Sequence, residues 1–284
     1  MKLAISHSQA EQFNQCEYKF KYASMDKLEP NVRGEALQTG TNGHEFFEAF
    51  FKGIKDFMSI EEATMSGYLA MQEDNAKIAV RVMPLVTKWV NTKWRDNLEH
   101  VWEVILVEET HRIELRELGQ FPFTMDLIIK DKKTGQHYMV DHKFLGQFYS
   151  QEVIDLMPQM PKYIAAFESK MGIKFAGAIY NMVCTRVNAA EESLFRMVRF
   201  KVSDARKNNA MFEQVETLKS IREVVEGRRL PVRSVNKMNC GHCGFRQLCN
   251  AEINGETAEL QFIKDTLYQE NTYGYEYVEP KDRE

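Results

Sequence analysis

The spacing of hydrophobic and polar residues predicts helices in the first part of the chain. A mixed stretch that begins at Ser6 or Ser8 as N-cap and runs to about Tyr22 is typical of a helix, and Cys16 would lie on it. The run GHEFFEAFFKGIKDF, residues 43–57, follows helical periodicity with a row of phenylalanines available for burial. This part of the chain is therefore expected to be helical.

One or two further helices and then a change to strand-like alternation follow. Residues 60–98 predict one or two helices with a break near Pro84, because proline interrupts helical hydrogen bonding. Strand-like runs occupy residues 101–115, 121–129, 137–144 and 175–185, and helices are expected at 161–171 and 203–227. The order of elements predicts an α/β fold with a central mixed β-sheet flanked by helices.

The composition is that of an ordinary globular protein. The chain has 284 residues, of which 44% are hydrophobic, so it can bury a sizeable core. No apolar run approaches the roughly 20 residues that cross a bilayer, and the N-terminus lacks the apolar region of a signal peptide. We expect a cytoplasmic protein without a membrane partner.

The net charge of -4 limits how the chain could bind nucleic acid. Bulk electrostatic attraction would need a positive protein, so a polynucleotide site must be a local basic surface or one whose acidic residues are neutralised by metal. Basic candidates lie near both ends of the chain: Lys19, Lys21, Lys27, Arg228, Arg229, Arg233 and Lys237. Such residues are more often solvated surface charges.

Two aspartates occupy matched positions on a predicted hairpin. If the chain reverses symmetrically through Lys133 and Thr134, Asp126 faces Asp141 with Cβ atoms roughly 5 Å apart. Lys143 projects to the same face as Asp141, and His142 to the other. Paired carboxylates repel unless a cation lies between them, and oxygen ligands suit Mg²⁺ or Mn²⁺. A lysine beside such a metal fits phosphodiester hydrolysis.

A simpler interpretation remains open on this geometry alone. Asp126 and Asp141 could be ordinary polar residues at strand ends, with Lys143 as their surface partner. The pattern D-x-K is short and arises often by chance.

Four motifs follow one another over nearly the whole chain: Gly40-Thr41-Asn42-Gly43-His44, then Asp126, then Asp141-His142-Lys143, and finally Gln159-Met160-Pro161-Lys162-Tyr163. This ordered set resembles the RecB-type branch of the PD-(D/E)xK nucleases. The resemblance implies that His44, Asp126 and Asp141 ligate the metal together with the backbone carbonyl of His142. It makes Lys143 the catalytic lysine, and it gives Gln159 and Tyr163 a part in positioning DNA or the site. Either Glu108 or Glu109 could match a further acidic position of the family.

Four cysteines suggest a second metal site. Cys240, Cys243 and Cys249 lie in one short segment, and Cys16 could supply a fourth thiolate from the other end of the chain. Four thiolates suffice for Zn²⁺ or for an iron-sulfur cluster, and the spacing leaves the metal open. Cys184 lies in an apolar run and is expected to be a buried small hydrophobic residue.

The cysteine pattern resembles the iron-sulfur sites of AddB-type and CRISPR-adaptation nucleases. The resemblance implies a [4Fe-4S] cluster on Cys16, Cys240, Cys243 and Cys249, which would close a helical subdomain. We expect one domain over residues 1–267, with 1–30 and 228–255 around the cluster, the nuclease core at 100–190, and a loosely ordered tail at 268–284.

The sequence therefore predicts a metal-dependent DNA nuclease, most simply an exonuclease that favours single-stranded DNA ends. The resemblance implies a role in recombination, repair or phage DNA processing, with a helicase or recombinase as a possible partner. One alternative is a non-catalytic DNA-binding or assembly module of such a complex. Another is a protein with zinc at the four cysteines and no nuclease activity.

Overall fold

The computed structural model describes residues 2–32, 34–71, 76–186, 189–272 and 275–278. The chain divides into two compact units. Unit 1 comprises Met1–Arg33, Arg112–Phe123 and Met211–Glu284, and unit 2 comprises Gly34–His111 and Thr124–Ala210. The expected organisation as a single domain remains a prediction.

Unit 2 is built on a mixed β-sheet, as the sequence predicted. Its strands are ordered β7-β6-β5-β4, and β3 also pairs with β4. The β5 and β6 strands are parallel, whereas β4–β5 and β6–β7 are antiparallel. The bounds are β3 (Trp102–Glu114), β4 (Gly119–Asp131), β5 (His137–Leu145), β6 (Phe175–Cys184) and β7 (Phe195–Phe200). The β7 strand was not predicted.

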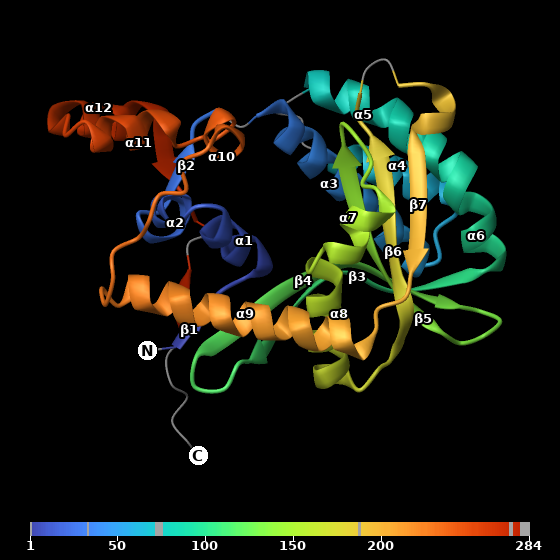
Figure 1. The fold of residues 1–284 in the computed structure, drawn as a ribbon. Coiled ribbons are helices and arrows are strands. Elements are labelled where there is room, and N and C mark those ends of the chain that lie inside the picture. The colour runs from blue at the N-terminus through green and yellow to red at the C-terminus, as the bar shows by residue number, and fades with distance from the viewer. Residues whose placement is uncertain (1, 33, 72–75, 187–188, 273–274, 279–284) are drawn as a thin grey trace. The chain divides into compact units, whose positions relative to one another are not determined.

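Helices cover both faces of this sheet (Figure 1). One face carries α3 (Glu35–Lys55), α4 (Ile60–Ala70), α5 (Ala76–Trp89) and α6 (Arg95–His100), and the other carries α7 (Gln151–Leu156) and α8 (Gln159–Met171). Phe46, Phe47, Phe50 and Phe51 are buried as expected and are at most 1% exposed, whereas Phe57, beyond the end of α3, is exposed. They pack with Trp89 and Trp94 into the main hydrophobic core.

The predicted break at Pro84 is wrong, because Pro84 lies inside α5. Proline removes the hydrogen bond to the carbonyl of Val80, but Pro84 and Val80 lie on an exposed part of the helix, where water can replace that bond. The departure from regular α-helix comes later, as a π-helical turn at Val90–Trp94. Residues 72–75 of the predicted helical stretch lie outside the described residues.

Unit 1 brings the two ends of the chain side by side (Figure 1). The β1 strand (Lys2–Ala4) lies between the start of β4 and β9 (Glu276–Val278), and β2 (Leu28–Pro30) pairs with β8 (Tyr268–Glu270). Its helices are α1 (His7–Gln15), α2 (Glu17–Phe20), α10 (Lys237–Gly241), α11 (Arg246–Ile253) and α12 (Thr257–Leu267). The remaining α-helix, α9 (Asp204–Val225), has residues in both units.

Two features of unit 1 differ from expectation. Cys16 has extended backbone between α1 and α2, so the predicted helix is interrupted there instead of passing through it. Ser6 is the N-cap of α1 and forms a capping box with Gln9. The segment expected to be a loose tail contains β8 and β9, whose backbone groups are satisfied by pairing with N-terminal strands.

No helix among the described residues is both long and apolar enough to span a membrane.

Candidate metal and cluster sites

The β4–β5 hairpin has the register that the sequence predicted. Leu127 pairs with Val140, so the next position along places Asp126 opposite Asp141. The backbone N–H of His142 donates a hydrogen bond to Oδ2 of Asp126 at 2.8 Å. The two aspartates therefore lie together at one point of the sheet.

His44 meets Asp126 and one glutamate at the same place. Nδ1 of His44, on α3, lies 3.6 Å from Oδ2 of Asp126 and 3.7 Å from Oε1 of Glu108. Among the described residues, these three side chains form the one group of three possible metal ligands whose ligand atoms all lie within 4.8 Å of one another. A helix and two strands thus contribute one ligand each.

The local backbone selects Glu108 over Glu109. Glu108 has φ of +43° inside β3, a conformation that a side chain other than glycine rarely adopts. Its side chain joins His44 and Asp126, whereas the more exposed Glu109 lies 3.3 Å from His111. The sequence could not distinguish Glu108 from Glu109, because the alternation of side chains in a regular strand does not predict a residue with left-handed backbone conformation.

Asp141 lies beside the predicted lysine. Nζ of Lys143 is 2.8 Å from Oδ2 of Asp141 and donates a hydrogen bond of 3.0 Å to Oε1 of Gln159 at the start of α8. Tyr163 lies one turn after Gln159 on the same helix and is buried. The structure thus brings Asp141, Lys143 and Gln159 together. Tyr163 is buried on α8, the helix that begins with Gln159.

Burial and neighbouring charges perturb the acidity of these groups. Burial raises the pKa of Asp126, and burial together with the nearby Asp126 charge raises the pKa of Asp141 to about 6. Burial alone would lower the pKa of His44, but Asp126 and Glu108 outweigh it and raise the value to about 9. Burial alone would also lower the pKa of Lys143. The charges of Asp141 and Asp126 outweigh it, so the pKa of Lys143 is raised.

These residues fit a divalent cation. Asp141 is only 3% exposed, and a buried carboxylate with a raised pKa lacks sufficient positive charge nearby. One imidazole nitrogen and several carboxylate oxygens form a donor set that accepts Mg²⁺ or Mn²⁺. A cavity of about 550 Å³ opens beside them, lined by residues of α3 that include His44 and by Glu108, His142, Lys143 and Phe144.

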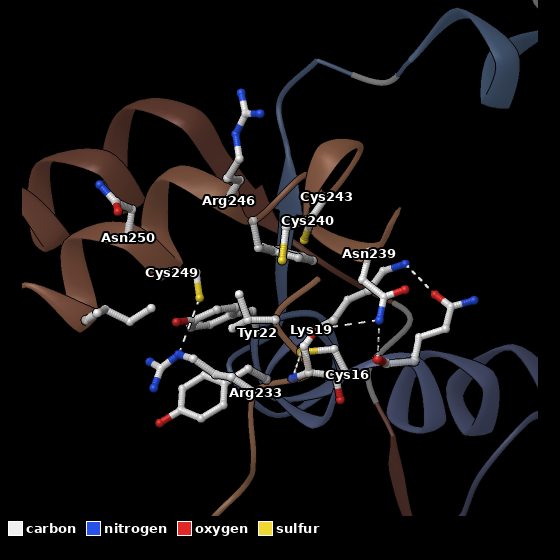
Figure 2. A pocket seen from close by; sticks show the side chains of 16 residues that line it. Cys16, Lys19, Tyr22, Arg233, Asn239, Cys240, Cys243, Arg246, Cys249 and Asn250 are labelled. Atoms are coloured by element: carbon white, nitrogen blue, oxygen red, sulfur yellow. Dashed lines mark hydrogen bonds between the residues drawn. The ribbon is translucent and has the colours of Figure 1, made fainter. Parts of the chain in front are cut away.

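In unit 1, all four predicted cysteine ligands line one cavity. This cavity of about 160 Å³ contains Cys16, Cys240, Cys243 and Cys249 in its wall, and Figure 2 shows their sulfur atoms around a shared space. Cys184 is buried in β6 of unit 2 and takes no part. Residues separated by more than 220 positions in the sequence therefore line the same cavity.

A hydrogen-bond donor lies beside each of two cysteine sulfurs. Nε of Arg233 lies 3.3 Å from Sγ of Cys249 (Figure 2). The backbone nitrogen of Ser234 lies 3.5 Å from Sγ of Cys16. The guanidinium of Arg233 also stacks over the ring of Tyr18, 3.4 Å from its centroid. Burial raises the pKa of the Cys243 thiol, so a bound metal would be needed to hold it as thiolate. The donor set and its surroundings fit a thiolate-bound metal group.

Some of the basic residues near the chain ends are paired with carboxylates. Several pair with acidic side chains of their own unit: Lys21 with Asp26, Arg228 with Glu226, and Arg229 with Glu17.

Comparisons with known proteins agree with this geometry. A family model described as the PD-(D/E)XK nuclease superfamily matches residues 4–250. No curated protein sequence matches the chain. A protein of Eubacterium rectale, provisionally described as an exonuclease, has a similar structure with a TM-score of 0.52 at 12% identity, over 81% of this chain and 84% of that one. An alkaline exonuclease of Laribacter hongkongensis gives a TM-score of 0.33 at 13% identity, over 64% of this chain and 94% of that one.

Proposed function

Because the chain belongs to the PD-(D/E)XK nuclease superfamily, we propose that it hydrolyses DNA phosphodiester bonds with Mg²⁺ or Mn²⁺ held by unit 2. The observation that carries the proposal is the group of His44, Glu108 and Asp126 within 4.8 Å, with Asp141 and Lys143 beside it. Asp141 and the backbone carbonyl of His142 complete the ligand set in this proposal. A divalent metal bound there would supply positive charge to a phosphate and acidify a bound water.

The side chains of the site suggest how each contributes. The ammonium group of Lys143 lies beside Asp141, where it can serve as a hydrogen-bond donor and positive charge toward phosphate oxygens. Asp141 and Gln159 both contact this ammonium and so restrict its position. Tyr163, one helical turn from Gln159, is proposed to support the same position or the DNA strand.

The finer assignments extend the same proposal. We place the chain in the RecB-type branch, as an exonuclease that favours single-stranded ends, on the order of its four motifs. The exonuclease descriptions of the E. rectale and L. hongkongensis proteins agree with this reaction class. A role in recombination, repair or phage DNA processing, with a helicase or recombinase partner, follows from the same resemblance.

The four-cysteine site is proposed to hold a [4Fe-4S] cluster. Four cysteines around one cavity suit either a zinc ion or an iron-sulfur cluster. The choice of the cluster follows from the resemblance of the cysteine pattern to the iron-sulfur sites of AddB-type and CRISPR-adaptation nucleases.

Digestion of matched DNA substrates tests the proposed function. Linear single-stranded, linear double-stranded and circular single-stranded DNA, labelled at one end where they have ends, are incubated with purified protein and Mg²⁺ or Mn²⁺. We expect linear single strands to be degraded fastest and circles to persist. Rapid cleavage of circles would replace the exonuclease proposal with an endonuclease, and DNA binding without cleavage under every metal condition would favour a non-catalytic assembly module.

A further inference from the structure

A buried chain of hydrogen bonds lies directly behind the candidate metal site. His142 projects to the opposite face of the sheet from Asp141, is 1% exposed, and pairs laterally with Asn181 in the β5–β6 register. The side-chain amide of Asn181 lies 2.7 Å from Nδ1 of His142, and Nε1 of Trp89 donates a 2.7 Å hydrogen bond to Oδ1 of Asn181. Trp89 and Asn181 are both 0% exposed.

The three partners determine one another's orientation. An indole N–H can only donate, so it fixes the oxygen of the Asn181 amide toward Trp89. The NH₂ group of Asn181 must then face His142 and donate to Nδ1. The imidazole is therefore the neutral tautomer with its proton on Nε2. A single indole thus defines the ring orientation of His142.

The same imidazole packs against the helix that carries His44. Its centroid lies 4.3 Å from the ring of Phe47 and 5.4 Å from that of Phe51, both on α3. Phe47 follows His44 by less than one helical turn, so α3 contacts the buried imidazole close to the point from which His44 extends. The side chain of His142 therefore contacts residues of β6, α5 and α3. In the sequence, His142 lies between Asp141 and Lys143.

We propose that Trp89, Asn181 and His142 form a positioning network that holds α3 against β5, so that His44 and the aspartates lie close enough to share one metal ion. The inference rests on the proposed metal-dependent function. His142 Nε2 has no hydrogen-bond partner among the described residues. Burying this N–H without a partner costs free energy of folding, and an apolar side chain would avoid that cost. Stability alone therefore does not explain a histidine at position 142. The side chains of the network act through the ligands, and none of these three side chains touches metal or substrate.

Binding of Mn²⁺ alone, measured by electron paramagnetic resonance, tests the network independently of cleavage. Asn181→Leu keeps a side chain of similar size and removes both hydrogen bonds, and we expect it to weaken Mn²⁺ binding about 10- to 100-fold. Ile179→Ala is the matched control, because Ile179 lies two residues earlier in β6 and is buried in the same core. It should lower the melting temperature while leaving Mn²⁺ affinity within about twofold, since only the polar link is tied to the ligands.

A second variant and a spectroscopic measurement keep the proposal testable if Asn181→Leu does not fold. Trp89→Phe retains an aromatic ring but removes the donor that orients Asn181, and it should also weaken Mn²⁺ binding. Nitrogen-15 NMR of labelled histidine should show the wild-type His142 ring protonated on Nε2. Unchanged Mn²⁺ affinity in the folded variants, or a ring protonated on Nδ1, would overturn the proposal. Wild-type protein that binds Mn²⁺ without cutting DNA would refute the proposed function and leave the network standing.

Discussion

The backbone N–H of His142 donates a 2.8 Å hydrogen bond to the side chain of Asp126 on the neighbouring strand. This contact joins the two motifs that carry the aspartates, because His142 follows Asp141 directly. It also places the peptide of His142 beside the carboxylate that faces His44. The proposed ligands are therefore linked through backbone as well as through any bound metal.

Glu108 and Glu109 offer a direct test of which acidic residue belongs to the site. Glu108→Gln should weaken Mn²⁺ binding and slow cleavage at least about 10-fold, because one charged oxygen ligand is replaced by a neutral amide. Glu109→Gln is the matched control and should leave both quantities close to wild type, since its side chain pairs with His111. Equal effects of the two substitutions in Mn²⁺ titrations would contradict the assignment.

Gly43 determines how closely α3 approaches β5. A Cβ atom there would lie 2.1 Å from the ring of Phe144, so Gly43→Ala must displace either the ring or the helix. We expect a loss of about 1–3 kcal/mol in the free energy of unfolding and weaker Mn²⁺ binding, because the adjacent His44 moves with the helix.

Gly40→Ala provides the control in the same helix. A Cβ atom at Gly40 meets nothing within 4 Å, so alanine should leave metal binding unchanged and stabilise the helix by up to about 1 kcal/mol. The double variant Gly43→Ala/Phe144→Ala should recover part of the lost Mn²⁺ affinity. If chemical denaturation and Mn²⁺ titration give the same result for both glycines, close packing at Gly43 does not matter.

The four-cysteine site predicts a coloured protein. Protein purified without oxygen should be brown and contain iron and sulfide in similar amounts, and Cys16→Ser should lose most of that colour because one iron is left open to solvent. Cys184→Ser should keep the colour, since Cys184 lies in β6 of the other unit. Absorption spectra and metal analysis provide the measurement. Stoichiometric zinc in a colourless wild-type protein would contradict the cluster.

Glu168 predicts a pH-dependent contribution to stability. Burial would raise its pKa, but hydrogen bonds from Lys207, the backbone N–H of Phe175 and Lys174 lower it below the ordinary glutamate value of 4.5. Because the folded-state pKa is lowered, this contribution is fully present above the unfolded value and is lost as the pH falls through the folded one. Glu168→Gln should lower the free energy of unfolding by about 1–3 kcal/mol near neutral pH. The deficit relative to wild type should shrink below about pH 4.

Substitution of Lys207 and of Lys174 distinguishes the buried ion pair of Glu168 from its exposed ion pair. The side chain of Lys207 is 12% exposed and that of Lys174 is 78% exposed. Lys207→Met should therefore cost more than Lys174→Met in denaturation curves at neutral pH, because solvent screens the exposed pair. A constant Glu168→Gln deficit from pH 3 to pH 8 would show that charge is not its source.

The sequence was sufficient where local geometry is regular. A symmetric hairpin fixes Asp126 opposite Asp141, and strand alternation puts Lys143 on the face of Asp141, so these relationships follow from counting residues. The phenylalanines of α3 were placed in the core for the same reason, since helical periodicity determines which face is buried.

The remaining features depend on contacts that no local pattern encodes. Glu108 lies in the site because its own backbone is left-handed within a strand. Cys16 lines its cavity from the extended residue between α1 and α2. Pro84 continues its helix where the sequence predicted an end, because the missing hydrogen bond lies on an exposed surface. The link from Trp89 through Asn181 to His142 joins segments more than 35 residues apart and leaves no motif in the sequence.

The rate of DNA cleavage by wild-type protein and by Asp141→Asn, with Mg²⁺ and with excess chelator, tests the central claim most directly. Asp141→Asn keeps the shape of the side chain while removing its charge, and cluster colour and melting temperature verify that the variant is folded. We predict cleavage by wild-type protein that chelator abolishes and added Mg²⁺ or Mn²⁺ restores, and a reduction of at least about 100-fold in Asp141→Asn. Wild-type cleavage that persists in excess chelator, or near-wild-type cleavage by folded Asp141→Asn, would contradict the account.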